Sequence, residues 1–166
     1  MSRDKSIRLG SSLSNIHTVN QFVEDICDHH NIFNSYFGHI LTAVTEAVQN
    51  AMMHGNQNDP EKIVTVTFEH TPEGLCFTIS DQGNGFDPGS LPDPTDLNND
   101  GLKGRGLFLM KTLADEVSFH NGGNTVELFF NITGIDQEHA AHRAQQVNKY
   151  LKTTSTVKDE PTTGKQ

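Results

Sequence analysis

The sequence predicts an α/β sandwich, in which a mixed, mostly antiparallel sheet is covered on one face by about three helices. Two observations support this prediction. Two segments with apolar residues at helical spacing come first, and two pairs of segments with alternating apolar residues follow, with one further helical segment between the pairs. Strands joined by short turns pair antiparallel, and each helix buries its apolar stripe against the sheet. At 166 residues, the chain is long enough for one domain with a substantial core.

Two helices are predicted in the first third of the chain. Residues 1–11 are polar and are interpreted either as a frayed lead-in or as a first edge strand. A helix over about residues 14–29 is indicated by the helical spacing of four apolar residues, Val19, Phe22, Val23 and Ile26. A second helix is predicted from Asn34 to His54, with Gly55 as its C-cap. Its core stripe consists of Phe37, Leu41, Val44, Val48 and Ala51.

Strands dominate the rest of the domain. The segments "KIVTVTFEH" and "GLCFTISD" alternate apolar and polar residues and predict a hairpin across "TPEG". The segment "GLFLMKTLADEV" predicts a third helix, whose inward side chains are Leu107, Met110, Leu113 and Ala114. The segments "VSFH" and "TVELFFNI" predict a closing hairpin across "NGGN".

The remaining segments set the domain boundaries. Residues 83–104 show no periodicity and are rich in Gly, Pro, Asp and Asn, which indicates a functional loop or disorder. We therefore predict one domain over residues 1–134, with a lid over residues 87–103. A polar helical extension over residues 135–151 and a disordered tail over residues 152–166 follow it.

The charge of the chain limits its partners. A formal net charge of −9 argues against direct binding of nucleic acid through a broad phosphate-neutralising surface. It still allows a small anionic ligand where basic residues gather locally. No signal peptide and no apolar run of transmembrane length is present, which predicts a cytoplasmic protein that does not bind a membrane.

The second predicted helix carries three polar residues at intervals of four: Glu46, Asn50 and His54. A solvated polar face is one interpretation, but Ala43 and Ala47 surround these polar atoms with apolar surface. An Asn oxygen suits Mg²⁺ together with phosphate oxygens. A carboxylate one turn away can take a proton from a hydroxyl group or a water molecule. The pattern therefore favours a site for a magnesium nucleotide.

The segment "SDQGNGFDP" begins where a predicted strand ends. A carboxylate at this position, that of Asp81, can accept a hydrogen bond from an exocyclic amine such as that of adenine. Gly83 and Gly85 have no side chains, so a flat base can approach the backbone. By itself such a segment is commonly only a turn, and alone it would be a weak indication of a site.

The segment "KGRGLFLM" places a Gly-x-Gly pair, Gly104 and Gly106, directly before a predicted helix. The bare N–H groups and the positive end of a helix suit an anion. Lys103 and Arg105 add positive charge there. A flexible helix start is the alternative interpretation.

Together, the three segments resemble the motifs of the histidine-kinase-like ATPase (Bergerat) superfamily over about residues 10–133. The pattern E-x-x-x-N-x-x-x-H that begins at Glu46 is similar to the N box of that superfamily. The pattern D-x-G-x-G that begins at Asp81 is similar to its G1 box, and Gly104–Gly106 is similar to its G2 box. The resemblance implies the Bergerat ATP-binding fold and a site for ATP with Mg²⁺.

A stand-alone domain with Glu and Asn in the first motif is most similar to the anti-sigma-factor serine kinases. That resemblance implies a protein that binds a sigma factor and phosphorylates a serine or threonine on an antagonist protein. It implies Glu46 as general base, Asn50 as Mg²⁺ ligand and Asp81 as the residue that recognises adenine. The remaining implied cofactor-binding residues are His54, Gly83, Gly85, Lys103, Gly104, Arg105, Gly106 and Leu107.

Two questions stay open at this point. The alternative function is a non-catalytic, nucleotide-gated binding module that sequesters a regulatory partner. The chain also allows a homodimer.

Overall fold

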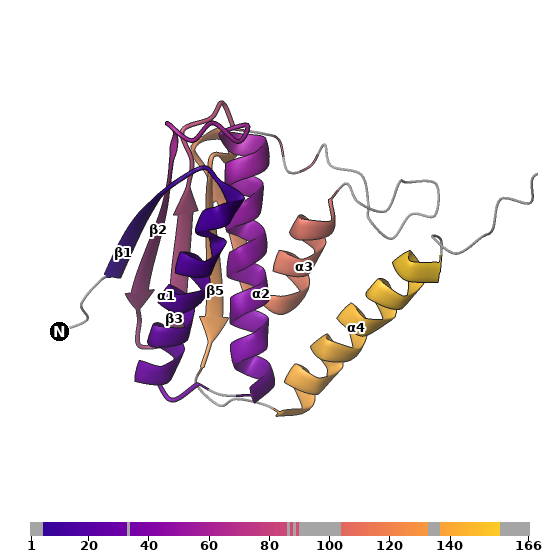
Figure 1. Cartoon of the computed structure of the whole chain (residues 1–166). Helices are drawn as coiled ribbons and strands as arrows, with labels where there is room; N and C mark the ends of the chain where they lie inside the picture. Colours follow the sequence, from indigo (N-terminus) through magenta and orange to yellow (C-terminus); the bar gives the residue numbers. More distant parts are fainter. Residues whose placement is uncertain are drawn as a thin grey trace, which may run out of the picture.

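Five strands form a single sheet in the spatial order β1-β2-β3-β5-β4 (Figure 1). The computed structural model describes residues 5–32, 34–85, 87, 89, 104–132 and 137–156. The strands are β1 (Lys5–Gly10), β2 (Ile63–His70), β3 (Gly74–Ser80), β4 (Glu116–His120) and β5 (Thr125–Asn131). Of the two interpretations of the N-terminal segment, the edge strand is correct, because β1 pairs with β2 from Lys5↔Phe68 to Gly10↔Ile63.

All four strand pairs in the described sheet are antiparallel, so it contains no parallel pair, whereas the sequence predicts a mixed sheet. The reason lies in the closing hairpin. β4 follows helix α3 (Arg105–Leu113), but it is the returning strand β5 that pairs with β3. Because β5 runs opposite to β3, the inserted helix does not create a parallel pair.

The helices are α1 (Ile16–His29), α2 (Asn34–Asn50), α3 and α4 (Gln137–Thr156). α1 and α2 lie side by side over one face of the sheet, α3 lies next to α2, and α4 lies outside α3 (Figure 1). α4 continues past residue 151, where the sequence analysis ends the helical extension. No helix within the described part of the chain is both long and apolar enough to span a lipid bilayer.

The chain does not leave the helical path at the end of α2 but widens into a π turn, Ala51–Gly55. The backbone N–H of Asn56 donates to the carbonyl of Ala51 at 2.8 Å, a bond between residues five apart. The prediction of Gly55 as a C-cap is therefore wrong. The left-handed backbone conformation falls later, at Gln57 and Asn58, with φ values of 54° and 56°.

The core lies between the sheet and the helices that cover it. Most of the predicted core residues are buried: Val44 and Val48 of α2 have no exposed surface, and Met110 and Leu113 of α3 are 2% and 3% exposed. Phe22, Phe37 and Leu41 are partly buried and pack against this core. On the other face of the sheet, the half-exposed side chains of Thr65, Thr67, Thr78 and Glu127 alternate with the core residues. A polar outer face of this kind is typical of an antiparallel sheet covered on one side.

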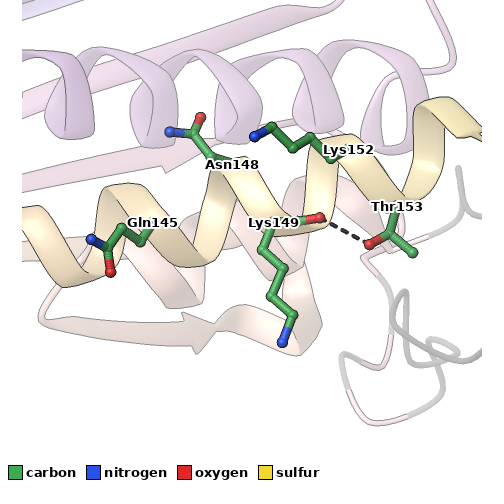
Figure 2. A pocket seen from close by; sticks show the side chains of 5 residues that line it. All are labelled: Gln145, Asn148, Lys149, Lys152 and Thr153. Atoms are coloured by element: carbon green, nitrogen blue, oxygen red, sulfur yellow. Dashed lines mark hydrogen bonds between the residues drawn. The ribbon is translucent and has the colours of Figure 1, made fainter.

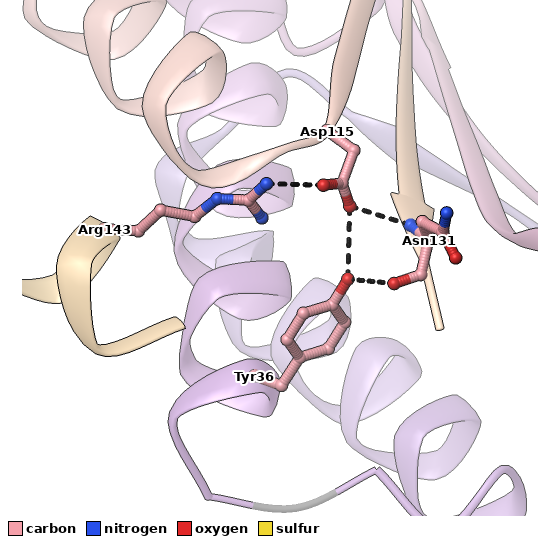
Figure 3. A network of polar contacts seen from close by, with 4 residues as sticks. All are labelled: Tyr36, Asp115, Asn131 and Arg143. Carbon is pink, nitrogen blue, oxygen red and sulfur yellow. Dashed lines mark hydrogen bonds and ion pairs between the residues drawn. The ribbon is translucent and has the colours of Figure 1, made fainter. Parts of the chain in front are cut away.

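A network of four residues ties α4 to the domain (Figure 3). Arg143 of α4 forms an ion pair with Asp115 at 2.5 Å. The other carboxylate oxygen of Asp115 accepts hydrogen bonds from the Tyr36 hydroxyl at 3.1 Å and from the backbone N–H of Asn131 at 2.8 Å. Tyr36 also donates to the carbonyl of Asn131.

The same network explains why α3 ends at Leu113, whereas the sequence predicts helix to residue 117. Ala114 has an extended backbone conformation, with φ −82° and ψ 152°. The backbone N–H of Asp115 donates to the carbonyl of Phe129 in β5 at 2.9 Å, so the chain joins the sheet at this point.

Buried His39 makes the stability of the protein sensitive to acid. This side chain is 6% exposed, and neither ring nitrogen has a hydrogen-bond partner among the described residues. Burial and the nearby Arg143 lower the pKa of His39 below its ordinary 6.5, while Asp115 opposes them. The unfolded chain therefore binds this proton more readily, and the free energy of unfolding falls as the pH drops below 6.5 towards the lowered pKa.

We therefore expect the His39→Phe variant to lose part of this pH dependence. Urea unfolding of the parent and the variant between about pH 8 and pH 5 measures it. The unfolding midpoint of the variant should fall less steeply with acid than that of the parent. Equal slopes would contradict the assignment to His39.

Candidate functional site

Two of the predicted motifs meet where α3 packs against α2. Gly106, in the first turn of α3, lies directly over the side chains of Asn50 and Glu46. A Cβ atom at Gly106 would lie 2.8 Å from Nδ2 and 3.1 Å from Oδ1 of Asn50, and 3.1 Å from Oε2 of Glu46. Ala43 and Ala47, on the same face of α2, are fully buried. Glu46 and Asn50 therefore do not form a solvated helix face. The alanines next to them in the sequence indicate the same.

The Glu46 carboxylate lies in a partly desolvated position. Burial raises its pKa above the ordinary 4.5, and the positive charge of Arg105 partly opposes this effect. Tyr150 of α4 lies within electrostatic reach of both groups. A carboxylate whose pKa is raised in this way is a stronger base than an ordinary glutamate.

The N-terminus of α3 offers several N–H groups. Gly104 adopts a left-handed conformation, with φ 80°, directly before the helix. The first intrahelical bond runs from the N–H of Phe108 to the carbonyl of Gly104 at 2.9 Å, so the N–H groups of residues 105–107 have no intrahelical acceptor. The side chain of Leu107 packs into the core, which leaves only its backbone for a ligand. Lys103 lies outside the described residues.

Arg105 supplies a positive charge at this helix end. Its Nε atom is buried and has no hydrogen-bond partner among the described residues. Buried polar atoms of this kind are rare, because each costs about 1–3 kcal/mol when it is left without a partner. An anion bound at the start of α3 would provide the missing acceptor.

Asp81 follows the last residue of β3 and lies against the π turn. Its Oδ1 atom accepts the backbone N–H of Gly83 at 2.8 Å. A Cβ atom at Gly55 would lie 2.3 Å from Oδ2 of Asp81, so any other residue at position 55 would displace this carboxylate. Burial raises the pKa of Asp81 above 3.8, while the bond from Gly83 and the charge of Lys62 oppose the rise.

Asn56 joins the elements around Asp81 and is not singled out by the sequence analysis. It is 0% exposed. Its Nδ2 donates to Ser11 Oγ at 2.8 Å and to the carbonyl of Ile63 at 3.1 Å, and its Oδ1 accepts the backbone N–H of Gln82 at 2.8 Å. In the sequence, Asn56 begins a polar run that resembles an ordinary turn, so no local signal distinguishes it.

The other predicted site residues occupy different surroundings. Gly85 approaches the β4–β5 turn so closely that a Cβ atom there would lie 2.1 Å from the carbonyl oxygen of Gly122. His54 is exposed at the end of the π turn, and no described contact connects it to Glu46 or Asn50. Most of the predicted lid, residues 87–103, lies outside the described residues.

The close approach of Gly83 to the π turn gives a direct test of this geometry. A Cβ atom at Gly83 would lie 1.9 Å from the carbonyl oxygen of Gly55, and backbone on both sides would have to shift. We expect Gly83→Ala to lower the free energy of unfolding by about 1–3 kcal/mol. Urea unfolding of the variant measures this loss.

Gly38→Ala is the matched control. Gly38 lies inside α2, where an added Cβ would have no atom within 4 Å. Replacing a helical glycine by alanine should stabilise the fold by about 0.5–1 kcal/mol. The two substitutions add the same methyl group, and opposite signs are expected. Two changes of the same sign would contradict the packing described for Gly83.

A surface hollow of about 440 Å³ lies along α4 (Figure 2). The described residues that line it are Gln145, Asn148, Lys149, Lys152 and Thr153. All five lie on one helix, and none comes from α2, β3 or the start of α3. Because a ligand site normally combines apolar walls with converging polar groups from several elements, we do not assign a function to this hollow.

The arrangement as a whole brings the half-buried carboxylates of Glu46 and Asp81, the amide of Asn50 and the N-terminus of α3 around the C-terminal end of α2 and the π turn. Glu46 and Asn50 of the first motif lie against Gly106 of the third, and Gly55, the residue after the first motif, lies against Asp81 of the second. Such a site can bind an anion at the start of α3, an amine at Asp81 and a proton at Glu46.

Comparisons with known proteins identify the family of this domain. A family described as histidine kinase-like ATPase domain matches residues 9–130. An anti-sigma F factor from Anoxybacillus flavithermus is 34% identical over 100 residues, which cover 57% of this chain and 68% of that protein. A serine-protein kinase RsbW from Staphylococcus aureus is 36% identical over 95 residues, which cover 52% of this chain and 60% of that protein.

A solved structure of the RsbU and RsbW domains of Rv1364c from Mycobacterium tuberculosis is similar in fold, with a TM-score of 0.54 and 17% identity. The similarity covers 78% of this chain and 32% of that one, and at this identity it concerns the fold alone. The chain spans between 60% and 68% of the two curated relatives named above. The match to the family, in contrast, includes Glu46, Asp81 and Gly106 and most of the chain. The resemblance inferred from the three motifs is confirmed, and the chain belongs to the histidine kinase-like ATPase domain family.

Proposed function

We propose that this chain is an ATP-dependent protein kinase that phosphorylates a serine or threonine on an antagonist protein and also binds a sigma factor. The observation that carries the proposal is the Glu46 carboxylate. It lies one helical turn from Asn50, beside Gly106 and within electrostatic reach of Arg105. A site that only bound nucleotide would not need a base at this position.

The residues of the site fit ATP and Mg²⁺. The space over Asn50 and Glu46 exists because position 106 is glycine, and a Cβ atom there would fill it. The buried Nε of Arg105 and the N–H groups at the start of α3 suit phosphate oxygens. The amide oxygen of Asn50 would hold Mg²⁺, which shields phosphate charge when it is bound.

The chain itself would perform three tasks. Asp81 would accept a hydrogen bond from the adenine amine. Arg105 and the start of α3 would bind the negative charge of the phosphates. Glu46 would accept the proton of the attacking hydroxyl group, a role that its raised pKa supports.

The proposed partners follow from the relatives. One relative is named an anti-sigma F factor and another a serine-protein kinase, and each matches more than half of this chain. A sigma factor and a protein carrying the phosphorylated hydroxyl group are therefore the two partners that we assign. The competing hypothesis is a nucleotide-gated module that sequesters its partner and transfers no phosphate.

Labelled ATP distinguishes these two functions. The chain would be incubated with γ-labelled ATP, Mg²⁺ and candidate antagonist proteins encoded beside it. We expect label on one antagonist, and loss of the label when the acceptor serine or threonine is replaced by alanine. Binding of the antagonist without transfer under all nucleotide conditions would support the sequestration hypothesis instead.

A further inference from the structure

Hydrogen bonds from three consecutive backbone N–H groups restrain the segment that carries Asp81. The N–H of Asp81 donates to the carbonyl of Asn124 at 2.9 Å, and the N–H of Gly83 donates to Oδ1 of Asp81 itself at 2.8 Å. Between them, the N–H of Gln82 donates to Oδ1 of Asn56 at 2.8 Å. Among the three acceptors, Asn56 supplies the side chain that comes from another element.

Asn56 belongs to a closed ring of hydrogen bonds. Its Nδ2 donates to the carbonyl of Ile63 at 3.1 Å, the N–H of Ile63 donates to Oε1 of Gln82 at 2.6 Å, and the N–H of Gln82 returns to Oδ1 of Asn56. The ring joins the residue after the π turn, the first residue of β2 and the segment after β3. A polar network in which every member has a partner holds its elements rigidly.

The orientation of the Asn56 amide is determined by its partners. The hydroxyl group of Ser11 donates to the carbonyl of Lys62 at 2.8 Å, so its oxygen is left to accept a hydrogen of Asn56 Nδ2, also at 2.8 Å. The carbonyl of Ile63 can only accept, and the backbone N–H of Gln82 can only donate. Oδ1 of Asn56 must therefore face Gln82. Because Asn56 is fully buried, loss of its amide would leave these groups without their partner.

The backbone of Asn56 connects the same residue to the π turn. Its N–H closes that turn through the carbonyl of Ala51, and the preceding residue, Gly55, packs against the carboxylate of Asp81. Asn50 leads into the turn from α2. One residue therefore holds the end of the π turn with its backbone and the segment after β3 with its side chain.

We propose that Asn56 is a positioning residue for recognition of the nucleotide base, because its amide holds the Asp81 carboxylate in the orientation that selects adenine. The inference rests on the proposed function, in which Asp81 accepts the amine of adenine. Asn56 acts through Gln82 and not on the nucleotide, since both of its amide hydrogens are donated within the protein. Without its bond to Gln82, the segment would lose its attachment to the π turn. The Asp81 carboxylate would then adopt several orientations, of which only some accept the amine.

Amide hydrogen exchange tests this attachment without nucleotide. In the parent protein, the N–H of Gln82 should exchange as slowly as the amides of β3, although the Gln82 side chain is exposed. In the Asn56→Ala variant, exchange at Gln82 and Gly83 should become about tenfold faster relative to β3, the equivalent of one lost buried hydrogen bond. Ser11→Ala is the matched control, because it removes another partner of Asn56 and leaves the bond to Gln82 in place. It should not change this ratio.

Calorimetric titration with ATP and GTP tests the effect on base recognition. In Asn56→Ala, the Kd for ATP should rise by about tenfold while the Kd for GTP changes little. A merely structural role would weaken the binding of both nucleotides equally. Ser11→Ala should keep the preference of the parent for ATP, even where its unfolding midpoint is lower. Asn56→Thr, which fills more of the site, takes the place of Asn56→Ala if the alanine variant does not fold.

Unchanged relative exchange at Gln82 and Gly83 in the Asn56 variant would overturn the proposal. An undiminished preference for ATP in that variant, where the parent prefers ATP, would overturn it as well. Failure of the proposed function gives a different result. If the parent binds ATP and GTP equally and exchange is still faster in the variant, Asn56 does position Asp81, and recognition of adenine by Asp81 is refuted.

Discussion

Replacement of Glu46 by glutamine should lower the rate of phosphate transfer by about 10²–10⁴-fold, the usual contribution of a positioned general base. Glutamine keeps the shape of the side chain, so the packing of Gly106 over Glu46 and Asn50 should survive. ATP affinity should change little, because a base acts mainly in the transition state. Single-turnover transfer from labelled ATP, together with a direct binding measurement, separates the two quantities.

Asn50→Ala is the informative comparison for this variant. An oxygen that held Mg²⁺ would act in the ground state and in the transition state, so its loss should weaken magnesium-dependent ATP binding as well as transfer. If Glu46→Gln phosphorylates the antagonist as fast as the parent protein, Glu46 is not the base. The proposed mechanism would then be wrong.

The second large effect is expected at Asp81. Asp81→Ala should weaken ATP binding by roughly 1.5–3 kcal/mol, the value of a hydrogen bond to a charged group. That loss corresponds to about a 10- to 150-fold higher Kd. The reason is that the exocyclic amine of adenine would lose its charged acceptor. Titration calorimetry with ATP and GTP measures the effect, and the parent protein should bind GTP far more weakly, because guanine presents a carbonyl oxygen at that position.

The Asp81→Asn variant distinguishes recognition of adenine from local folding around residue 81. The asparagine oxygen can still accept the backbone N–H of Gly83, which the structure places 2.8 Å from Oδ1 of Asp81. Its amide nitrogen, however, donates where the carboxylate accepts. This variant should lose affinity for ATP and lose its discrimination against GTP while remaining folded. Undisturbed ATP binding in both variants would refute the assignment of Asp81.

The sequence predicts the elements of this fold well because each is encoded locally. In α1 and α2, the spacing of apolar residues indicates which side of the helix faces the core. In β2 and β3, the alternation of apolar and polar residues does the same for the strand. The turn "NGGN" in the same way predicts the hairpin of β4 and β5. Glu46 and Asn50 can be recognised as candidate site residues by the alanines next to them. Apolar residues around polar ones indicate that this helix face contacts another element.

Contacts between distant segments could not be predicted in the same way. The end of α3 depends on Asp115, whose partners Tyr36, Asn131 and Arg143 come from three other elements. Asn56 has a clear role only when Ser11, Ile63 and Gln82 are brought around it. Tyr150 lies in a polar segment of low hydropathy, so nothing in the sequence indicates that it reaches α3.

The π turn after α2 has a consequence for how this site can vary. A π turn holds one residue more than an ordinary α-helical turn, so Ala51–Gly55 carries an extra residue within the helical path. Before the turn, Glu46 and Asn50 lie against Gly106 of α3, and at the end of the turn Gly55 lies against Asp81. Loss of a single residue here should rotate Glu46 and Asn50 relative to Gly55 and the neighbouring Asp81. The π turn therefore fixes how these groups are oriented relative to one another, and a single deletion there should change that orientation without replacing any of their side chains.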